Sequence, residues 1–170
     1  MPFQSGCQIH QGDVNGMLIN LLLGLFIMEC CLLLQSLLVV AALRYYAHRQ
    51  DYVKHASLWL TIWVVNGVMV ILVAGNVLQV AIWALLFRLI GEFSSIGEAF
   101  YHSAVNFSTL GYGDIVMSKQ HKILGPMEAI NGVLMIGVST AALMGLFRDA
   151  MKKTIEAKRT ASKKAHDMKK

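Results

Sequence analysis

Thr109-Leu110-Gly111-Tyr112-Gly113-Asp114 is a glycine-rich hexapeptide that stands between two apolar segments of different length. The segment before it, residues 95–108, opens with a helix-capping pattern, because Ser95 is followed three residues later by Glu98. This segment is long enough for a short helix but not for a bilayer crossing. The segment after it, residues 123–147, is long and apolar enough to cross once. The hexapeptide is therefore predicted to lie on a loop between a short helix and a membrane span.

The composition of the chain indicates an integral membrane protein. Its 170 residues are 56% hydrophobic and 15% charged, with a mean hydropathy of +0.55, which is too apolar for a soluble domain of this length. Two further apolar runs, Met17 to Leu43 and Leu58 to Phe87, are each predicted to cross once. The three cysteines offer neither a disulfide framework nor a spaced zinc site, and no catalytic pair lies at workable spacing. We expect neither an enzyme nor a nucleic-acid partner.

Basic residues indicate which parts of the chain face the cytoplasm. Of the 15 Lys and Arg residues, three lie in residues 44–54, and nine lie in residues 148–170 together with only three acidic residues. The positive-inside rule places both segments in the cytoplasm, so residues 1–16 and the hexapeptide are expected outside. The loop that carries the hexapeptide then enters and leaves the membrane by the same face. We expect a multi-pass protein of the bacterial inner (plasma) membrane.

The order of outer helix, short helix, Thr-x-Gly-Tyr-Gly-Asp string and inner helix resembles the pore domain of tetrameric potassium channels, over roughly Leu58 to Phe147. The resemblance implies an all-α membrane fold with three transmembrane helices, a re-entrant pore helix and a selectivity-filter loop, assembled as a homotetramer. It implies passive, selective conduction of K+. A weakly selective cation channel and a non-conducting interaction protein with a pore-loop fold are the alternatives. The expected segments are an extracytoplasmic N-terminus (1–16), an additional transmembrane helix (17–43), a cytoplasmic basic loop (44–57), a pore domain (58–147) with pore helix 95–108, filter 109–114 and inner helix 123–147, and a cytoplasmic basic tail (148–170).

The resemblance also implies roles for the filter residues. Backbone carbonyls along Thr109, Leu110, Gly111, Tyr112 and Gly113 are expected to bind K+, aided by the Thr109 hydroxyl. The two glycines can adopt positive φ without a Cβ clash, which allows neighbouring carbonyls to turn the same way. Tyr112 is expected to brace the loop against the pore helix, and Asp114 to hold its outer end by hydrogen bonds. The chain departs from the family at Val105, where some members have a buried carboxylate, and at Met117, where many have proline.

Several residues of the inner helix are candidates for support and gating. Glu128 and Asn131 share a face of the helix, where they either brace the filter from behind or satisfy one another. By resemblance, Gly137 lies near the gating hinge of the family, although a small residue also suits helix packing. Gly132 is expected to tolerate alanine as an ordinary helical position. The candidates for the cavity lining are Leu134, Val138 and Ala141.

Two further features leave open more than one interpretation. Glu29 lies in the middle of the first apolar run, where it is either functional or packed against a polar neighbour such as Gln35. The basic tail, residues 148–170, either binds anionic lipid or simply continues the positive-inside pattern as a solvated helix.

Overall fold

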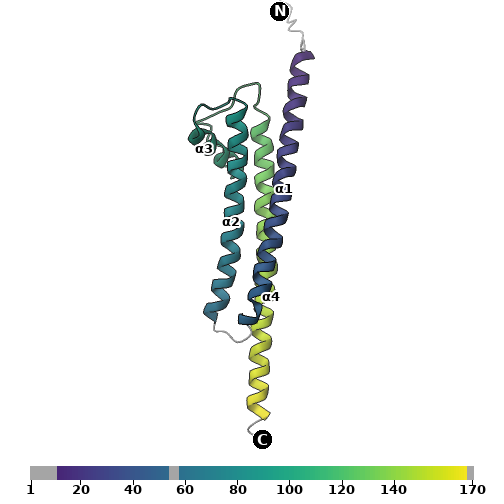
Figure 1. The fold of residues 1–170 in the computed structure, drawn as a ribbon, viewed down its shortest axis with the longest axis vertical. Coiled ribbons are helices and arrows are strands. Elements are labelled where there is room, and N and C mark those ends of the chain that lie inside the picture. The colour runs from purple at the N-terminus through teal and green to yellow at the C-terminus, as the bar shows by residue number, and fades with distance from the viewer. Residues whose placement is uncertain (1–10, 54–57, 168–170) are drawn as a thin grey trace, which may run out of the picture. The chain divides into compact units, whose positions relative to one another are not determined.

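A computed structural model describes residues 11–53 and 58–167, and every regular element within these ranges is an α-helix (Figure 1). Three of the helices are long and apolar enough to cross a membrane, and the fourth is short. The predicted all-α fold with three spans and one short helix is confirmed. The helices are α1 (Gln11–Val53), α2 (Leu58–Leu89), α3 (Ile96–Phe107) and α4 (Leu124–Asp167).

Helices α1 and α4 extend beyond the apolar runs that predicted them. Residues 44–53 were expected in a loop, but α1 continues through them to Val53. The reason is that this basic stretch contains neither glycine nor proline, so nothing in it terminates the helix. Residues 54–57, the remainder of the expected loop, lie outside the described residues. Helix α4 likewise continues through the basic tail to Asp167.

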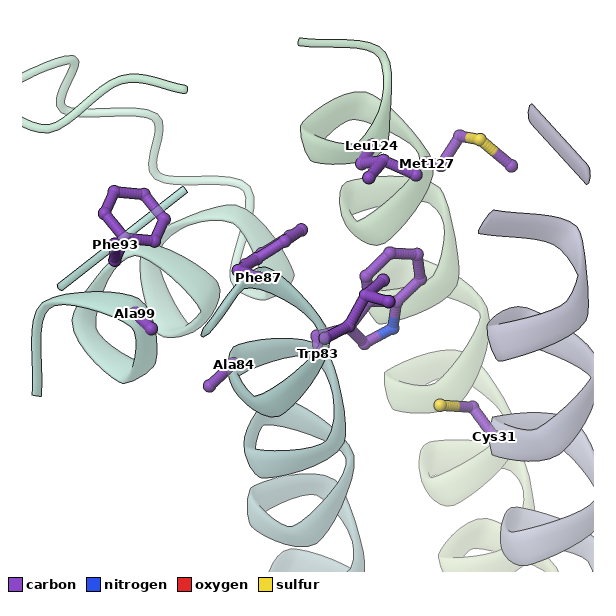
Figure 2. Close-up of a cluster of buried hydrophobic side chains, with 9 residues drawn as sticks. Cys31, Trp83, Ala84, Phe87, Phe93, Ala99, Leu124 and Met127 are labelled. Carbon is purple, nitrogen blue, oxygen red and sulfur yellow. The ribbon is translucent and has the colours of Figure 1, made fainter. Parts of the chain in front are cut away.

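The chain divides into two compact units, of which the first comprises the described residues up to Leu32 together with residues 79–133. Its core combines parts of all four helices, and Figure 2 shows these side chains. Trp83 and Phe87 of α2 are completely buried, with ring centroids 5.8 Å apart. Helix α1 contributes the buried Cys31 to the same cluster. The additional helix is therefore part of the core of the unit that contains the hexapeptide.

The second unit comprises residues 33–78 and the described residues from Leu134. Its apolar core includes Val68 and Leu72 of α2, both almost fully buried. Two side-chain hydrogen bonds join α1 to α4 in this unit. They run from Gln35 Nε2 to Ser139 Oγ (2.8 Å) and from the Tyr46 hydroxyl to Asp149 Oδ2 (3.0 Å).

The same turn motif ends both α2 and α3. After α2, the Gly91 N–H donates to the Arg88 carbonyl (3.3 Å) and the Glu92 N–H to the Phe87 carbonyl (3.1 Å), which is the Schellman pattern. Gly91 has φ +81°, as expected for the glycine that usually occupies the left-handed position of this motif. The motif places Glu92 directly at the start of the connection to α3.

A glycine on α4 allows the end of α3 to approach the backbone of α4 closely. A Cβ atom built on Gly132 would lie 2.0 Å from the carbonyl oxygen of Phe107, the last residue of α3. The expectation that alanine is tolerated at Gly132 is therefore wrong, because the position is a backbone contact rather than an open helix surface.

We expect Gly132→Ala to destabilise the first unit by about 1–3 kcal/mol or more, because the added methyl group overpacks a backbone contact that cannot rotate away. Thermal unfolding of the purified protein in detergent measures the effect. Gly145→Ala is the matched control on the same helix, since a Cβ atom built there would have no neighbour within 4 Å. Equal stability of the two variants would contradict the close approach of α3 and α4.

Candidate functional site

Helix α3 leads directly into the hexapeptide and is capped at both ends. At its start, the Ser95 Oγ accepts a hydrogen bond from the Gly97 N–H (3.2 Å), as the capping pattern predicted. At its end, the C-cap residue Ser108 donates its hydroxyl to the Ala104 carbonyl (2.7 Å). Including its two caps, the helix has the predicted bounds 95–108.

The hexapeptide begins in a second Schellman motif, with a residue that is unusual there. The Thr109 N–H donates to the Asn106 carbonyl (2.8 Å), and the Leu110 N–H donates to the Val105 carbonyl (2.9 Å). Thr109 thus occupies the left-handed position, with φ +59°. A β-branched residue is strained in this region, and such strain is concentrated at functional sites. This conformation of Thr109 was not predicted from the sequence.

Positive φ recurs at every second residue of the hexapeptide. After Thr109, Gly111 has φ +58° and Gly113 has φ +73°, whereas Leu110 and Tyr112 between them do not have positive φ. The positive φ predicted for the two glycines is confirmed. The two side chains between these residues are largely exposed, Leu110 by 57% and Tyr112 by 66%. The bracing contact expected of Tyr112 is therefore not made within a single chain.

Side chains of α3 hold the last residue of the hexapeptide and the residue that follows it. The Tyr101 hydroxyl donates to Asp114 Oδ2 (2.8 Å). His102 Nδ1 lies 3.0 Å from the Ile115 carbonyl, and its Nε2 lies 2.9 Å from Asn106 Nδ2. These partners fit a neutral ring that donates from Nδ1 and accepts at Nε2. Burial lowers the pKa of His102, and the Ile115 carbonyl only partly offsets this.

A cavity of about 450 Å³ borders the backbone of the hexapeptide. It reaches from Val105 on α3 past Thr109 and Gly111 to Pro126 on α4. Val105 lies at this boundary, so the cavity wall is apolar at this point. The hexapeptide is consequently open on one side within the single chain.

Glu128 ties α4 to the back of α3. It is fully buried, and its Oε1 contacts the hydroxyl of Ser103, which also lies 2.8 Å from the Val80 carbonyl of α2. Asn131 is equally buried, and its amide lies beside the Cys31 thiol of α1 and makes no hydrogen bond to Glu128. Glu128 and Asn131 therefore do not satisfy one another, which leaves bracing from behind as the prediction for Glu128.

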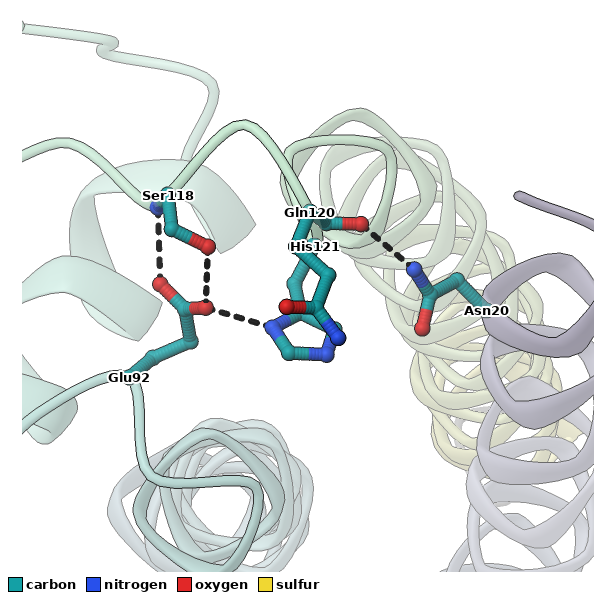
Figure 3. A network of polar contacts seen from close by, with 5 residues as sticks. All are labelled: Asn20, Glu92, Ser118, Gln120 and His121. Atoms are coloured by element: carbon teal, nitrogen blue, oxygen red, sulfur yellow. Dashed lines mark hydrogen bonds and ion pairs between the residues drawn. The ribbon is translucent and has the colours of Figure 1, made fainter. Parts of the chain in front are cut away.

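A polar network holds the loop between the hexapeptide and α4, and its members were not singled out from the sequence. Figure 3 shows Glu92 in contact with Ser118 and His121, and Asn20 of α1 in contact with Gln120. These residues are far apart in the sequence and belong to no recognisable motif, so only the folded chain reveals the network.

The candidates for the gating hinge and for the cavity lining all lie on an exposed face of α4 in the second unit. Leu134 is 46% and Val138 42% exposed, Ala141 is exposed, and nothing lies within 4 Å of a Cβ built on Gly137. The hinge and cavity-lining roles stay predictions. Glu29 is exposed on α1. Gln35, which was suggested as its packing partner, instead donates a hydrogen bond to Ser139.

Comparison with known proteins places this geometry in a family. A family model described as an ion channel matches residues 58–149, which is more than half of the chain. The match covers α2, α3, the hexapeptide and the first part of α4, and it leaves α1 outside. No curated protein and no solved structure matches the chain.

Replacing Glu128 tests its contact with α3. The Ser103 hydroxyl carries one proton and has two oxygen neighbours, so it cannot donate to both at once. An amide at position 128 can donate to Ser103 Oγ and retain the link, whereas leucine cannot. We expect Glu128→Leu to lower the free energy of unfolding by about 1–3 kcal/mol and Glu128→Gln to cost much less. Denaturation of both variants in detergent decides this, and equal losses would exclude the link.

Proposed function

Because the chain belongs to the ion channel family, in which two spanning helices flank a pore loop, we propose that it conducts K+ selectively and passively through the segment 109–114 of four identical subunits. The chain is a multi-pass membrane protein with three candidate spans. The alternating positive φ of the hexapeptide is the main observation that supports K+ as the conducted ion.

Alternating φ suits a row of ion-binding carbonyls. In an ordinary strand, successive carbonyls point to opposite sides. Reversing the sign of φ at every second residue, as at Thr109, Gly111 and Gly113, turns neighbouring peptide groups so that their carbonyls can share one side. Oxygen atoms placed in this way can replace the hydration shell of a K+ ion that enters the filter.

The fourfold assembly is proposed because one chain offers one carbonyl at each level, whereas a dehydrated ion needs a ring of them. The exposed Tyr112 and the open cavity beside the hexapeptide support this arrangement, since neighbouring copies can cover both. In the tetramer, the exposed face of α4 around Leu134, Val138 and Ala141 is proposed to line the central cavity. Gly137 on this face is proposed as the hinge.

Purified protein in liposomes distinguishes the proposal from its alternatives. Selective K+ flux supports it, whereas equal K+ and Na+ flux indicates a weakly selective cation channel. An intact, reconstituted protein without any flux indicates a non-conducting interaction protein.

Gly113 provides the sharpest test of the filter. With φ +73°, an alanine Cβ is strained by about 1–2 kcal/mol per chain, or roughly 4–8 kcal/mol over four chains if the strain is additive. We expect Gly113→Ala to retain the tetramer but to lose K+ selectivity or conduction in the liposome assay. Gly145→Ala, at an open helical position, is expected to conduct normally. Normal selectivity of Gly113→Ala would mean that residues 109–114 are not a working filter.

The basic tail is proposed to lie in the cytoplasm, with the filter outside, and to set the topology of the chain rather than to bind anionic lipid. The apolar part of α4 ends by Lys152, so the span does not require the remaining residues. We expect truncation after Lys153 to leave K+ flux intact in vesicles with and without anionic lipid. If anionic lipid stimulates the full-length protein but not the truncated one, the tail binds lipid and the topology-only interpretation fails.

A further inference from the structure

The carboxylate of Glu92 makes several contacts with the loop between the filter and α4. Glu92 Oε2 accepts a hydrogen bond from the Ser118 N–H (2.7 Å), and its Oε1 accepts from the Ser118 hydroxyl (2.6 Å) and lies 2.5 Å from His121 Nδ1 (Figure 3). Both oxygens are therefore engaged, by donors three residues apart in the loop. The Schellman motif at the end of α2 sets the position of Glu92 itself.

Helix α1 holds the same loop from another side. Asn20 is 5% exposed, and its Nδ2 donates to the Gln120 carbonyl (2.6 Å). One turn further along α1, a Cβ built on Gly24 would lie 2.6 Å from the Met127 side chain. Thus α1, which lies outside the segment matched by the family model, packs closely against the start of α4.

These contacts reach the filter through a short stretch of chain. Asp114 and Ile115 are hydrogen-bonded to α3, and Ser118 follows only three residues after Ile115. The contacts of Ser118 with Glu92 therefore add a restraint close to the outer end of the hexapeptide. We propose that Glu92 is a positioning residue of the pore, which fixes the outer end of the filter through Ser118 and His121. This proposal rests on the function proposed above. Asn20 is a second anchor of the same loop, and it has no titratable group.

The Glu92 contact has a definite pH dependence. Partial burial raises the pKa of Glu92, but the two hydrogen bonds from Ser118 and the contact with His121 outweigh it, so the pKa is lowered overall. A carboxyl group with a lowered pKa in the folded state stabilises that state at neutral pH, and this contribution is lost as the pH falls through the folded-state value. The titratable groups that face Glu92 are His121 in the loop and His102 on α3. Acid should therefore release Ser118 and leave the Asn20 contact in place.

Hydrogen exchange at the Ser118 amide tests the proposal in the full-length protein, together with K+ flux in the same liposomes. Exchange is expressed as protection relative to the intrinsic rate at each pH. We expect protection in the wild type at neutral pH and its loss below the usual titration range of glutamate. Glu92→Gln should lower neutral-pH protection by roughly tenfold or more, because hydrogen bonds to a charged group are lost, and should flatten the pH profile. K+ flux or selectivity should fall with it.

Three variants complete the design. Glu98→Gln removes the same charge from an exposed site on the first turn of α3 and should behave as wild type. Asn20→Ala should lower protection in the loop at every pH without moving the midpoint. Ser118→Ala keeps the carboxylate and the amide donor, so it provides a milder loss if Glu92→Gln fails to fold.

The outcomes separate this inference from the proposed function. Unchanged protection and flux in Glu92→Gln would overturn the role of Glu92 and leave the channel function standing. Absence of K+ flux in the wild type at every pH would overturn the channel function, even if Ser118 protection still followed Glu92.

Discussion

Irregular backbone is tolerated at membrane depth only where protein surrounds it, because hydrocarbon offers no partner for a free N–H or carbonyl group. The hexapeptide, which we propose lies at this depth, is irregular backbone of this kind, and the first unit supports it from one side. Helix α3 is capped at both ends, and its last carbonyls are engaged by Ser108, Thr109 and Leu110. Gly132 then allows α4 to approach the end of α3 at backbone distance. The loop thus has a rigid support on the side that faces its own chain.

Helix α1 lies outside the region matched by the family model, yet it completes the core of both units. In the first unit it contributes Cys31 and Asn20, and in the second unit it contributes Gln35 and Tyr46. Side-chain hydrogen bonds between helices in a membrane are each worth only about 1 kcal/mol, so such contacts act together rather than singly. A helix with partners along so much of its length is an integral part of both compact units.

Much of this arrangement could be predicted from patterns that are local in the sequence. Length and hydropathy identified three spans, the Ser95 capping pattern identified α3, and the glycines identified two positive φ values. The missed features depend on residues that meet only in the folded chain. Nothing local to Gly132 reveals the Phe107 carbonyl beside it, and no spacing rule connects Glu92 with Ser118. The predicted end of α1 was wrong because a basic stretch was equated with a loop, although charge does not terminate a helix.

The two Schellman motifs provide an internal comparison that bears on the filter. Helix α2 ends with Gly91 in the left-handed position, where glycine adopts φ +81° without a Cβ clash. Helix α3 ends with Thr109 in the equivalent position at φ +59°, at a cost of about 1–2 kcal/mol per chain that glycine would avoid. The conformation of the helix end therefore does not explain why position 109 is threonine. In the function proposed above, the Thr109 hydroxyl supplies an oxygen ligand for K+ that glycine lacks, and we propose this role as the reason for the strained residue.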